Sequence, residues 1–137
     1  MKNFIFVIIA LFTLASCDSV NNLYSNIGKK QETLLNSKWV LADELGSTKN
    51  PTLMIEKDKV YGNASCNNYF SNDFILEPKT GNFSVKKIGS TKMACENMKV
   101  EDNYLQSLEA VTNYVFTGNT LELYKDNLLM LKFKKLQ

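Results

Sequence analysis

The chain of 137 residues contains no histidine and no arginine. Without histidine it lacks the side chain that most often acts as a general base at neutral pH, and the commonest protein ligand of zinc and copper. Without arginine it lacks the planar guanidinium that holds a phosphate or carboxylate through two hydrogen bonds. These absences argue against Ser/His and Cys/His nucleophile pairs. We therefore expect a protein that is not an enzyme and that needs no cofactor and no metal.

The sequence also lacks an excess of charge of one sign. Its 16 lysines are nearly balanced by 14 acidic residues, so the formal net charge is +2. Proteins that bind nucleic acid usually concentrate positive charge on one face or stripe. Nucleic acid is therefore a poor candidate partner.

The one long apolar run stands at the N-terminus. Residues 4–12 are apolar throughout, and small residues then lead to Cys17. A run of about a dozen residues is typical of a cleaved export signal, because spanning a bilayer takes about 20. Since Leu14-Ala15-Ser16-Cys17 resembles a bacterial lipobox, we predict that residues 1–16 are a signal peptide and that Cys17 is lipidated. The alternative is an ordinary cysteine beside a conventional cleavage site.

Lipidation at Cys17 would anchor the protein to a membrane of the bacterial cell envelope, on the periplasmic side or at the cell surface. Residues 17–34 are polar and show no sustained periodicity, which predicts a flexible tether with an end-to-end distance of roughly 20 Å. A short helix around Leu23, Tyr24 and Ile27 is the alternative. What remains, residues 35–137, is long enough for one domain with its own core.

Short apolar segments separated by turn residues follow Lys38, a pattern typical of antiparallel β proteins. Four hairpins are predicted, with turns at residues 56–59, 78–81, 118–119 and 126–127. The predicted strands are Trp39–Leu41, Thr52–Ile55, Val60–Tyr61, Phe74–Leu76, Phe83–Val85, Tyr114–Phe116, Leu121–Tyr124 and Leu128–Phe133.

One segment, Lys99–Val111, has the period of a helix instead. Tyr104, Leu105, Leu108 and Val111 fall on one face, while Glu101, Asp102, Gln106 and Glu109 fall elsewhere. The acidic start of this segment suits the positive end of a helix dipole. The predicted fold class is α+β: a mainly antiparallel sheet, partly closed and barrel-like, with one packed amphipathic helix.

Beyond Cys17, Cys66 and Cys95 are the remaining cysteines. In an exported chain an even pair predicts a disulfide. Closing a loop of about 30 residues would stabilise the fold by roughly 3 to 4 kcal/mol. Two free thiols and a metal site are the alternatives, and the metal is the weaker one because zinc sites usually use four ligands.

Several motifs stand in a fixed order: Trp39-Val40-Leu41, Gly62-Asn63-Ala64-Ser65-Cys66-Asn67-Asn68-Tyr69, Ser90-Thr91-Lys92-Met93-Ala94-Cys95, the Tyr104-Leu105 helix and the Leu121-Glu122-Leu123 strand. Together, over about residues 35–135, they resemble the META domain family, which includes the HslJ-like heat-shock lipoproteins. Ser65 departs from the pattern, which usually has a glycine able to adopt positive φ. The resemblance implies a compact domain of antiparallel strands with one helix. It also implies an association with envelope stress, drug tolerance, and motility or secretion, without a general enzymatic activity or cofactor.

A candidate contact patch comprises Asn67, Asn68, Tyr69 and Lys92. A bridge at Cys66 would hold the first three where they could face a ligand, and Lys92 lies in the facing segment. A structural role is the alternative, because asparagines cap turns and a tyrosine beside a disulfide commonly packs over it. Lys92 as a nucleophile or anion site is weaker, since no activating neighbour is apparent in the sequence.

Three functions remain. The first is a membrane-tethered, non-enzymatic interaction or envelope-stress module that contacts an envelope protein, a lipid or cell-wall material. The second is a carrier of a small apolar ligand inside a partly closed β-barrel. The third is a hydrolase built on paired carboxylates, for which Glu96 with Glu101, or Asp73 with Glu77, could converge, whereas Glu101 and the adjacent Asp102 point apart on a helix.

Overall fold

The computed structural model describes residues 26–43, 49–96 and 98–137. The predicted signal peptide, the lipidation site Cys17 and the first part of the tether lie outside the described residues, so these assignments stay predictions. Within the described ranges, no helix is long and apolar enough to cross a membrane.

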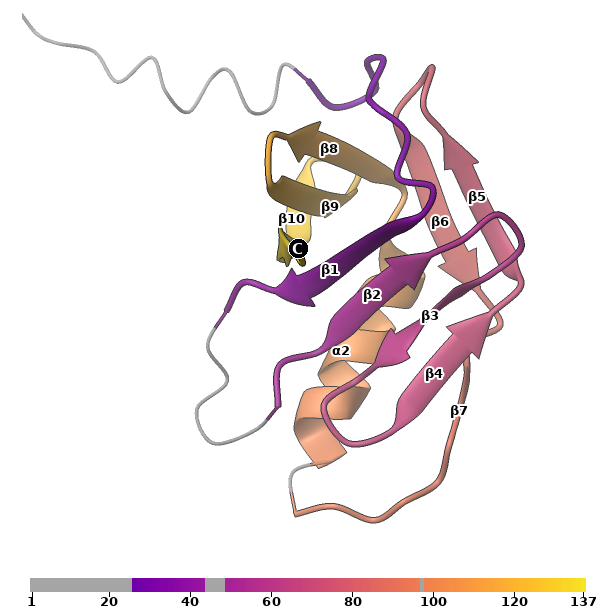
Figure 1. The fold of residues 1–137 in the computed structure, drawn as a ribbon, viewed down its shortest axis with the longest axis vertical. Helices are drawn as coiled ribbons and strands as arrows, with labels where there is room; N and C mark the ends of the chain where they lie inside the picture. Colours follow the sequence, from indigo (N-terminus) through magenta and orange to yellow (C-terminus); the bar gives the residue numbers. More distant parts are fainter. Residues whose placement is uncertain (1–25, 44–48, 97) are drawn as a thin grey trace, which may run out of the picture.

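One antiparallel sheet of ten strands curls into a half-barrel around helix α2 (Met98–Ala110) (Figure 1). The order of the strands across the sheet is β5-β6-β8-β9-β10-β1-β2-β3-β4-β7. The predicted fold class is confirmed. The strands are β1 (Ser37–Leu41), β2 (Thr52–Ile55), β3 (Val60–Asn63), β4 (Asn68–Ser71), β5 (Asp73–Glu77), β6 (Asn82–Lys86), β7 (Gly89–Ser90), β8 (Asn113–Thr117), β9 (Thr120–Lys125) and β10 (Leu128–Lys135).

The sheet has an apolar concave face because its strands alternate. In β2 and β3, Leu53, Ile55 and Val60 are buried, while Met54 and Tyr61 between them point outward. Successive side chains of a strand point to opposite faces, so this period of two creates an inner core and an outer face. Each predicted strand is found, and all but β2 are two residues longer than expected.

Two strands, β4 and β7, were not predicted. In β4 the buried positions are Tyr69 and Ser71 and the exposed ones are Asn68 and Phe70, so polar and aromatic residues occur on both faces. The pattern therefore has no clear apolar period. β7 is two residues long and pairs with β4 through Tyr69 and Phe70.

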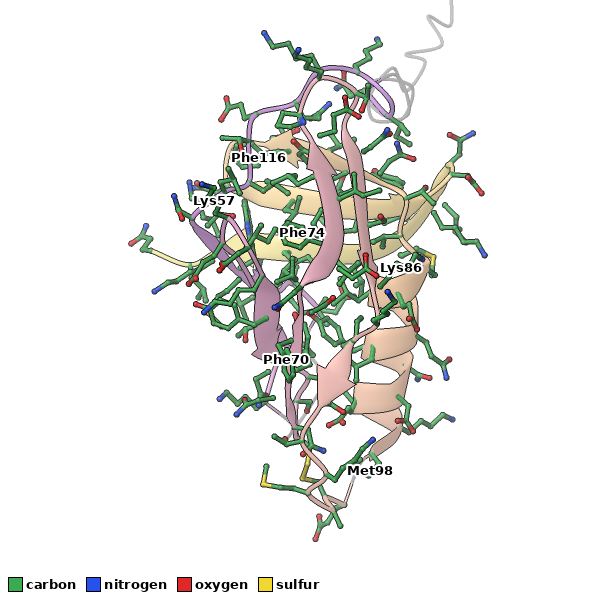
Figure 2. All side chains as sticks on the ribbon, turned by 90° about the vertical axis from the view of Figure 1, so that its right-hand side faces the viewer. Lys57, Phe70, Phe74, Lys86, Met98 and Phe116 are labelled. Carbon is green, nitrogen blue, oxygen red and sulfur yellow. A yellow bond between two sulfur atoms is a disulfide. The ribbon has the colours of Figure 1, made fainter. Side chains whose placement is uncertain are left out.

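Helix α2 fills the concave side of the sheet. Tyr104 and Leu108 are buried against the sheet, and the Tyr104 ring meets that of Phe133 edge to face, with 6.4 Å between centroids. At the end of the helix Lys86, labelled in Figure 2, donates from Nζ to the carbonyl oxygen of Glu109 at 2.6 Å. The helix prediction is confirmed within one residue at each end. Its predicted polar face is wrong at one position, because Glu101 is buried.

The folded domain begins earlier than predicted. Leu34 is buried in the core, and the carbonyl oxygen of Glu32 accepts a hydrogen bond from Tyr114 Oη at 2.6 Å. Gln31 N donates to Pro78 O at 2.7 Å, and its side-chain oxygen accepts from Phe116 N at 3.0 Å. Residues 31–34 therefore belong to the domain and not to the tether, since Gln31 and the Glu32 carbonyl are hydrogen-bonded to the domain and Leu34 is buried in its core.

Candidate functional site

The turn between β3 and β4 is organised by Asn67, which is fully buried. Asn67 N donates to Glu101 Oε2 at 2.8 Å, and Asn67 Nδ2 donates to Glu101 Oε1 and to Met93 O, both at 3.1 Å. Asn67 Oδ1 accepts from Thr91 Oγ1 at 2.7 Å and from Met93 N at 2.8 Å. One side chain thus joins the turn, helix α2 and the segment that follows β7.

The disulfide between Cys66 and Cys95 joins the same turn to the end of that segment. The two Cα atoms are 6.2 Å apart, within the reach of about 7 Å that a disulfide allows. The predicted bridge is confirmed. Ser65, immediately before it, has a φ of 89°, the left-handed conformation for which glycine is suited.

Tyr69 reaches from β4 to the backbone of β2. Its hydroxyl donates to Thr52 O at 2.8 Å and lies 2.8 Å from the hydroxyl of Tyr104. Burial, together with the neighbouring Tyr104, raises the pKa of Tyr69 well above its ordinary value, and burial also raises the pKa of Tyr104. Gly62 makes the approach possible, because a Cβ there would lie 2.0 Å from Thr52 O and 3.0 Å from the Tyr69 hydroxyl.

These contacts correct the predicted contact patch. Asn67 and Tyr69 are 0% and 1% exposed, so neither presents a side chain to a partner, and their prediction as surface contacts is wrong. Their polar groups are used inside the protein instead. Asn68 and Lys92 are exposed and stay available for contact.

The outer face of β2, β3 and β4 carries a hollow of about 580 Å³, which we call the outer hollow. This volume lies in the range of small-molecule sites, about 300 to 1,000 Å³. Three asparagines, Asn63, Asn68 and Asn72, are among the residues that line it. Lys49 and Lys59 add positive charge to its rim.

A row of three large side chains crosses the floor of the outer hollow. Met54 pairs with Tyr61 across β2 and β3, and Tyr61 pairs with Phe70 across β3 and β4. Phe70, labelled in Figure 2, is 60% exposed and its ring lies over Gly89, where a Cβ would be 3.3 Å from the ring. The row is therefore a platform of large side chains held in place by strand register, in which Phe70 is exposed and Met54 and Tyr61 are half-buried.

Two charged side chains beside the platform, Glu56 and Lys59, are paired with each other. Tyr61 Oη donates to Glu56 Oε1 at 2.6 Å, and Lys59 Nζ lies 3.3 Å from Glu56 Oε2 and 4.8 Å from the centre of the Tyr61 ring. The hydrogen bond from Tyr61 lowers the pKa of Glu56, with Lys59 adding to the effect. Glu56 is thus ionised at neutral pH, and its charge is matched locally.

A second hollow lies between α2 and the strands β1 and β10. It is mostly apolar, has a volume of about 170 Å³, and is lined by Leu41, Val100 and Leu131 together with Tyr104. This volume is below the usual range for a ligand pocket. The space inside the half-barrel is filled by large side chains, chiefly Trp39, Tyr69, Phe83, Tyr114 and Phe133.

Two of the carboxylates considered for hydrolysis, Glu101 and Asp73, have other partners. Both oxygens of Glu101 accept hydrogen bonds from Asn67, and Asp73 pairs with Lys87 at 2.9 Å. Asp73 and Glu77 stand at the two ends of the exposed strand β5. Within the described part of the chain, no cluster of three or more metal-ligating side chains is found.

Sequence reasoning missed the outer hollow, although a signal for it exists. Met54 and Tyr61 lie between buried apolar neighbours in strands that were predicted, so their outward direction follows from alternation. Phe70 lies in a strand that was not predicted. The register that aligns the three residues depends on the pairing of β3 with β4, which the sequence alone does not specify.

The fold and the bridged turn define a small antiparallel half-barrel domain closed by one helix. The model of the META domain matches residues 32–137, and the chain belongs to the META domain family. An NMR structure of another protein is similar with a TM-score of 0.55 and 18% sequence identity, over 72% of this chain and 88% of that chain. This likeness shows the fold alone. No curated protein matches the chain.

Proposed function

We propose that this META domain protein is a lipoprotein tethered through Cys17 to a membrane of the bacterial envelope, and that it works by contact as a non-enzymatic interaction or envelope-stress module. The contact surface in this proposal is the outer hollow with its platform of Met54, Tyr61 and Phe70. The N-terminal layout of an export signal ending in a lipobox supports the tether.

The observation that carries the proposal is the exposure of Phe70. Aromatic residues are enriched at protein interfaces relative to the rest of the surface, and the Phe70 side chain is 60% exposed and lines the outer hollow. The core does not need this side chain, because the ring lies on the outer face of the sheet. The same strand places Tyr69 inward. Tyr69 therefore contributes to the stability of the core, while its neighbour Phe70 is left for contact with a partner.

Photo-crosslinking in living cells tests this proposal. A photoreactive amino acid is placed at Phe70 of the full chain, and a matched control carries it at Ile75 of β5. Ile75 is also a large apolar residue and is 58% exposed. We expect irradiation to join position 70, but not position 75, to a component of the envelope.

Equal crosslinking from both positions, or none from position 70, would refute the outer hollow as the contact surface.

The tether is tested separately by Cys17→Ala. This variant should leave the membrane fraction or accumulate as an uncleaved precursor. A correctly cleaved variant that still fractionates with membranes would refute lipidation at Cys17.

A further inference from the structure

We propose that the outer hollow binds an anionic saccharide, a sugar chain that carries a carboxylate or phosphate group. This inference rests on the proposed function, because it names the class of ligand for the same surface. It follows from three properties of the hollow: free amides, an aromatic platform and a surplus of positive charge.

The amides supply hydrogen-bonding groups that the fold does not use. Within the described residues, Asn72 makes no side-chain hydrogen bond, and Asn68 uses its Oδ1, which accepts from Asn63 Nδ2 at 3.0 Å, while its Nδ2 has no protein acceptor. An amide offers both a donor and an acceptor. Sugar hydroxyls need the same combination, since each can donate and accept.

The platform supplies an apolar surface of the right kind. The face of an aromatic ring carries negative potential, and it attracts groups with positive edges. The C–H bonds on one face of a sugar ring are such groups. Phe70 and Tyr61 are neighbours across β3 and β4, and the exposed ring of Phe70 offers such a surface.

The charge of the residues that line the hollow favours one class of saccharide over another. A smaller adjoining hollow shares Met54 and Tyr61 with the outer hollow and brings in Lys38. The two hollows together are lined by three lysines, Lys38, Lys49 and Lys59, and one acid, Glu56, a formal surplus of two positive charges. Lys59 already balances the charge of Glu56, to which Tyr61 donates a hydrogen bond. The remaining lysines therefore favour a ligand with negative charge.

Shape and topology favour a saccharide over a bilayer or a peptide strand. The site is a hollow with polar walls, whereas insertion into a membrane interface needs an apolar surface that projects. A peptide that extends a sheet needs a free strand edge. β2, β3 and β4 are each paired on both sides, so their backbone is already used.

The test is an NMR titration of the purified full chain in detergent. The ligands are a disaccharide of N-acetylglucosamine and N-acetylmuramic acid, which carries a carboxylate, and the neutral disaccharide of N-acetylglucosamine. We expect the acidic sugar to bind at least about tenfold more tightly and to shift the side-chain amides of Asn68 and Asn72. Phe70→Ala should weaken binding about tenfold, since a central aromatic anchor is lost. Ile75→Ala should leave the affinity unchanged.

Vesicles of an anionic phospholipid form a second arm. Binding of these vesicles that requires Phe70, without binding of the acidic sugar, would overturn the saccharide and indicate a membrane surface. Equal affinity for the acidic and neutral sugars would also overturn the inference. If position 70 crosslinks a protein in cells while neither sugar binds, the saccharide is refuted and the contact function stands. If neither sugar binds and position 70 crosslinks nothing, both the saccharide and the contact function are refuted.

Discussion

Asn67 and Asn68 are adjacent residues of the same type with opposite roles. All side-chain polar atoms of Asn67 are partnered inside the protein, to Glu101, Thr91 and Met93. Asn68 is exposed and lies in the wall of the outer hollow. Strand β4 begins at Asn68, so one step along the chain moves the side chain from the interior to the outer face.

The first prediction compares alanine at these two positions. Asn67→Ala should lower the free energy of unfolding by about 3 kcal/mol, because it removes the side-chain hydrogen bonds to Glu101 Oε1, Thr91 and Met93, while the backbone N–H of residue 67 still binds Glu101 Oε2. Asn68→Ala should change it by less than about 0.5 kcal/mol, as expected of an exposed site. Urea unfolding followed by circular dichroism measures both values. Similar losses for the two variants would show that Asn67 is not the centre of the network.

The sequence could not assign these roles. Both residues stand in a turn motif beside a cysteine, where the residue type is compatible with a structural role as well as with a contact role. The decision depends on Glu101, which is 34 positions away and was placed on the polar face of its helix. A buried carboxylate is rare unless it is paired. The partner of Glu101 is the amide of Asn67, and the burial of that amide depends on the tertiary structure.

At the scale of elements, the segment between β7 and α2 is the part most dependent on specific links. Residues 91–96 are all exposed. They are held by the hydrogen bonds to Asn67 and by the disulfide of Cys95 with Cys66. A segment with so little buried apolar surface has a low cost of local opening.

The second prediction concerns this bridge. The double variant Cys66→Ser with Cys95→Ser should lose roughly 3 to 4 kcal/mol of stability, because the unfolded chain is no longer constrained. Amide hydrogen exchange should rise most in residues 91–96, which also lose their local link, and should rise in β8, β9 and β10 only by the factor that the loss of global stability sets. Reduced wild type is the matched control and should behave like the variant. The same factor of acceleration in residues 91–96 and in β8, β9 and β10 would contradict a local role for the bridge.

How much of the fold could be predicted depended on the type of element. The strands β2, β6 and β9 and the helix α2 carry strong apolar periods, and the sequence places them within two residues. β4 and β7 were missed because β4 buries Ser71 and exposes Phe70, and β7 has two residues. The alternation of apolar and polar residues does not identify a strand that follows a hydrogen-bonded turn and also forms part of an outer surface.

At the scale of the whole molecule, the same interior that closes the half-barrel makes the domain sensitive to alkali. Tyr69, Tyr104 and Tyr114 are buried, and each hydroxyl has a partner in the protein. Burial raises the pKa of Tyr114 to about 12 and raises the pKa of Tyr69 and Tyr104 as well. In the unfolded chain a tyrosine loses its proton near pH 10.

The third prediction follows from this difference. The stability contributed by these tyrosines should be complete below about pH 10 and should fall above it, since the unfolded state then binds fewer protons than the folded state. Each buried tyrosine should remove about 1.4 kcal/mol per pH unit until its pKa in the folded state is reached. Urea unfolding at several values between about pH 9 and pH 12 measures the slope.

Tyr104→Phe provides the control, because exposed lysines titrate in the same range in both proteins and cancel in the comparison. Burial dominates the raised pKa of Tyr104, so its phenylalanine variant should lose stability less steeply with pH, by the contribution of one tyrosine. Phenolate absorbance should appear together with unfolding for the buried residues. Full ionisation near pH 10 in a protein that stays folded, or equal slopes in the two proteins, would contradict the buried phenol network as the origin of alkaline unfolding.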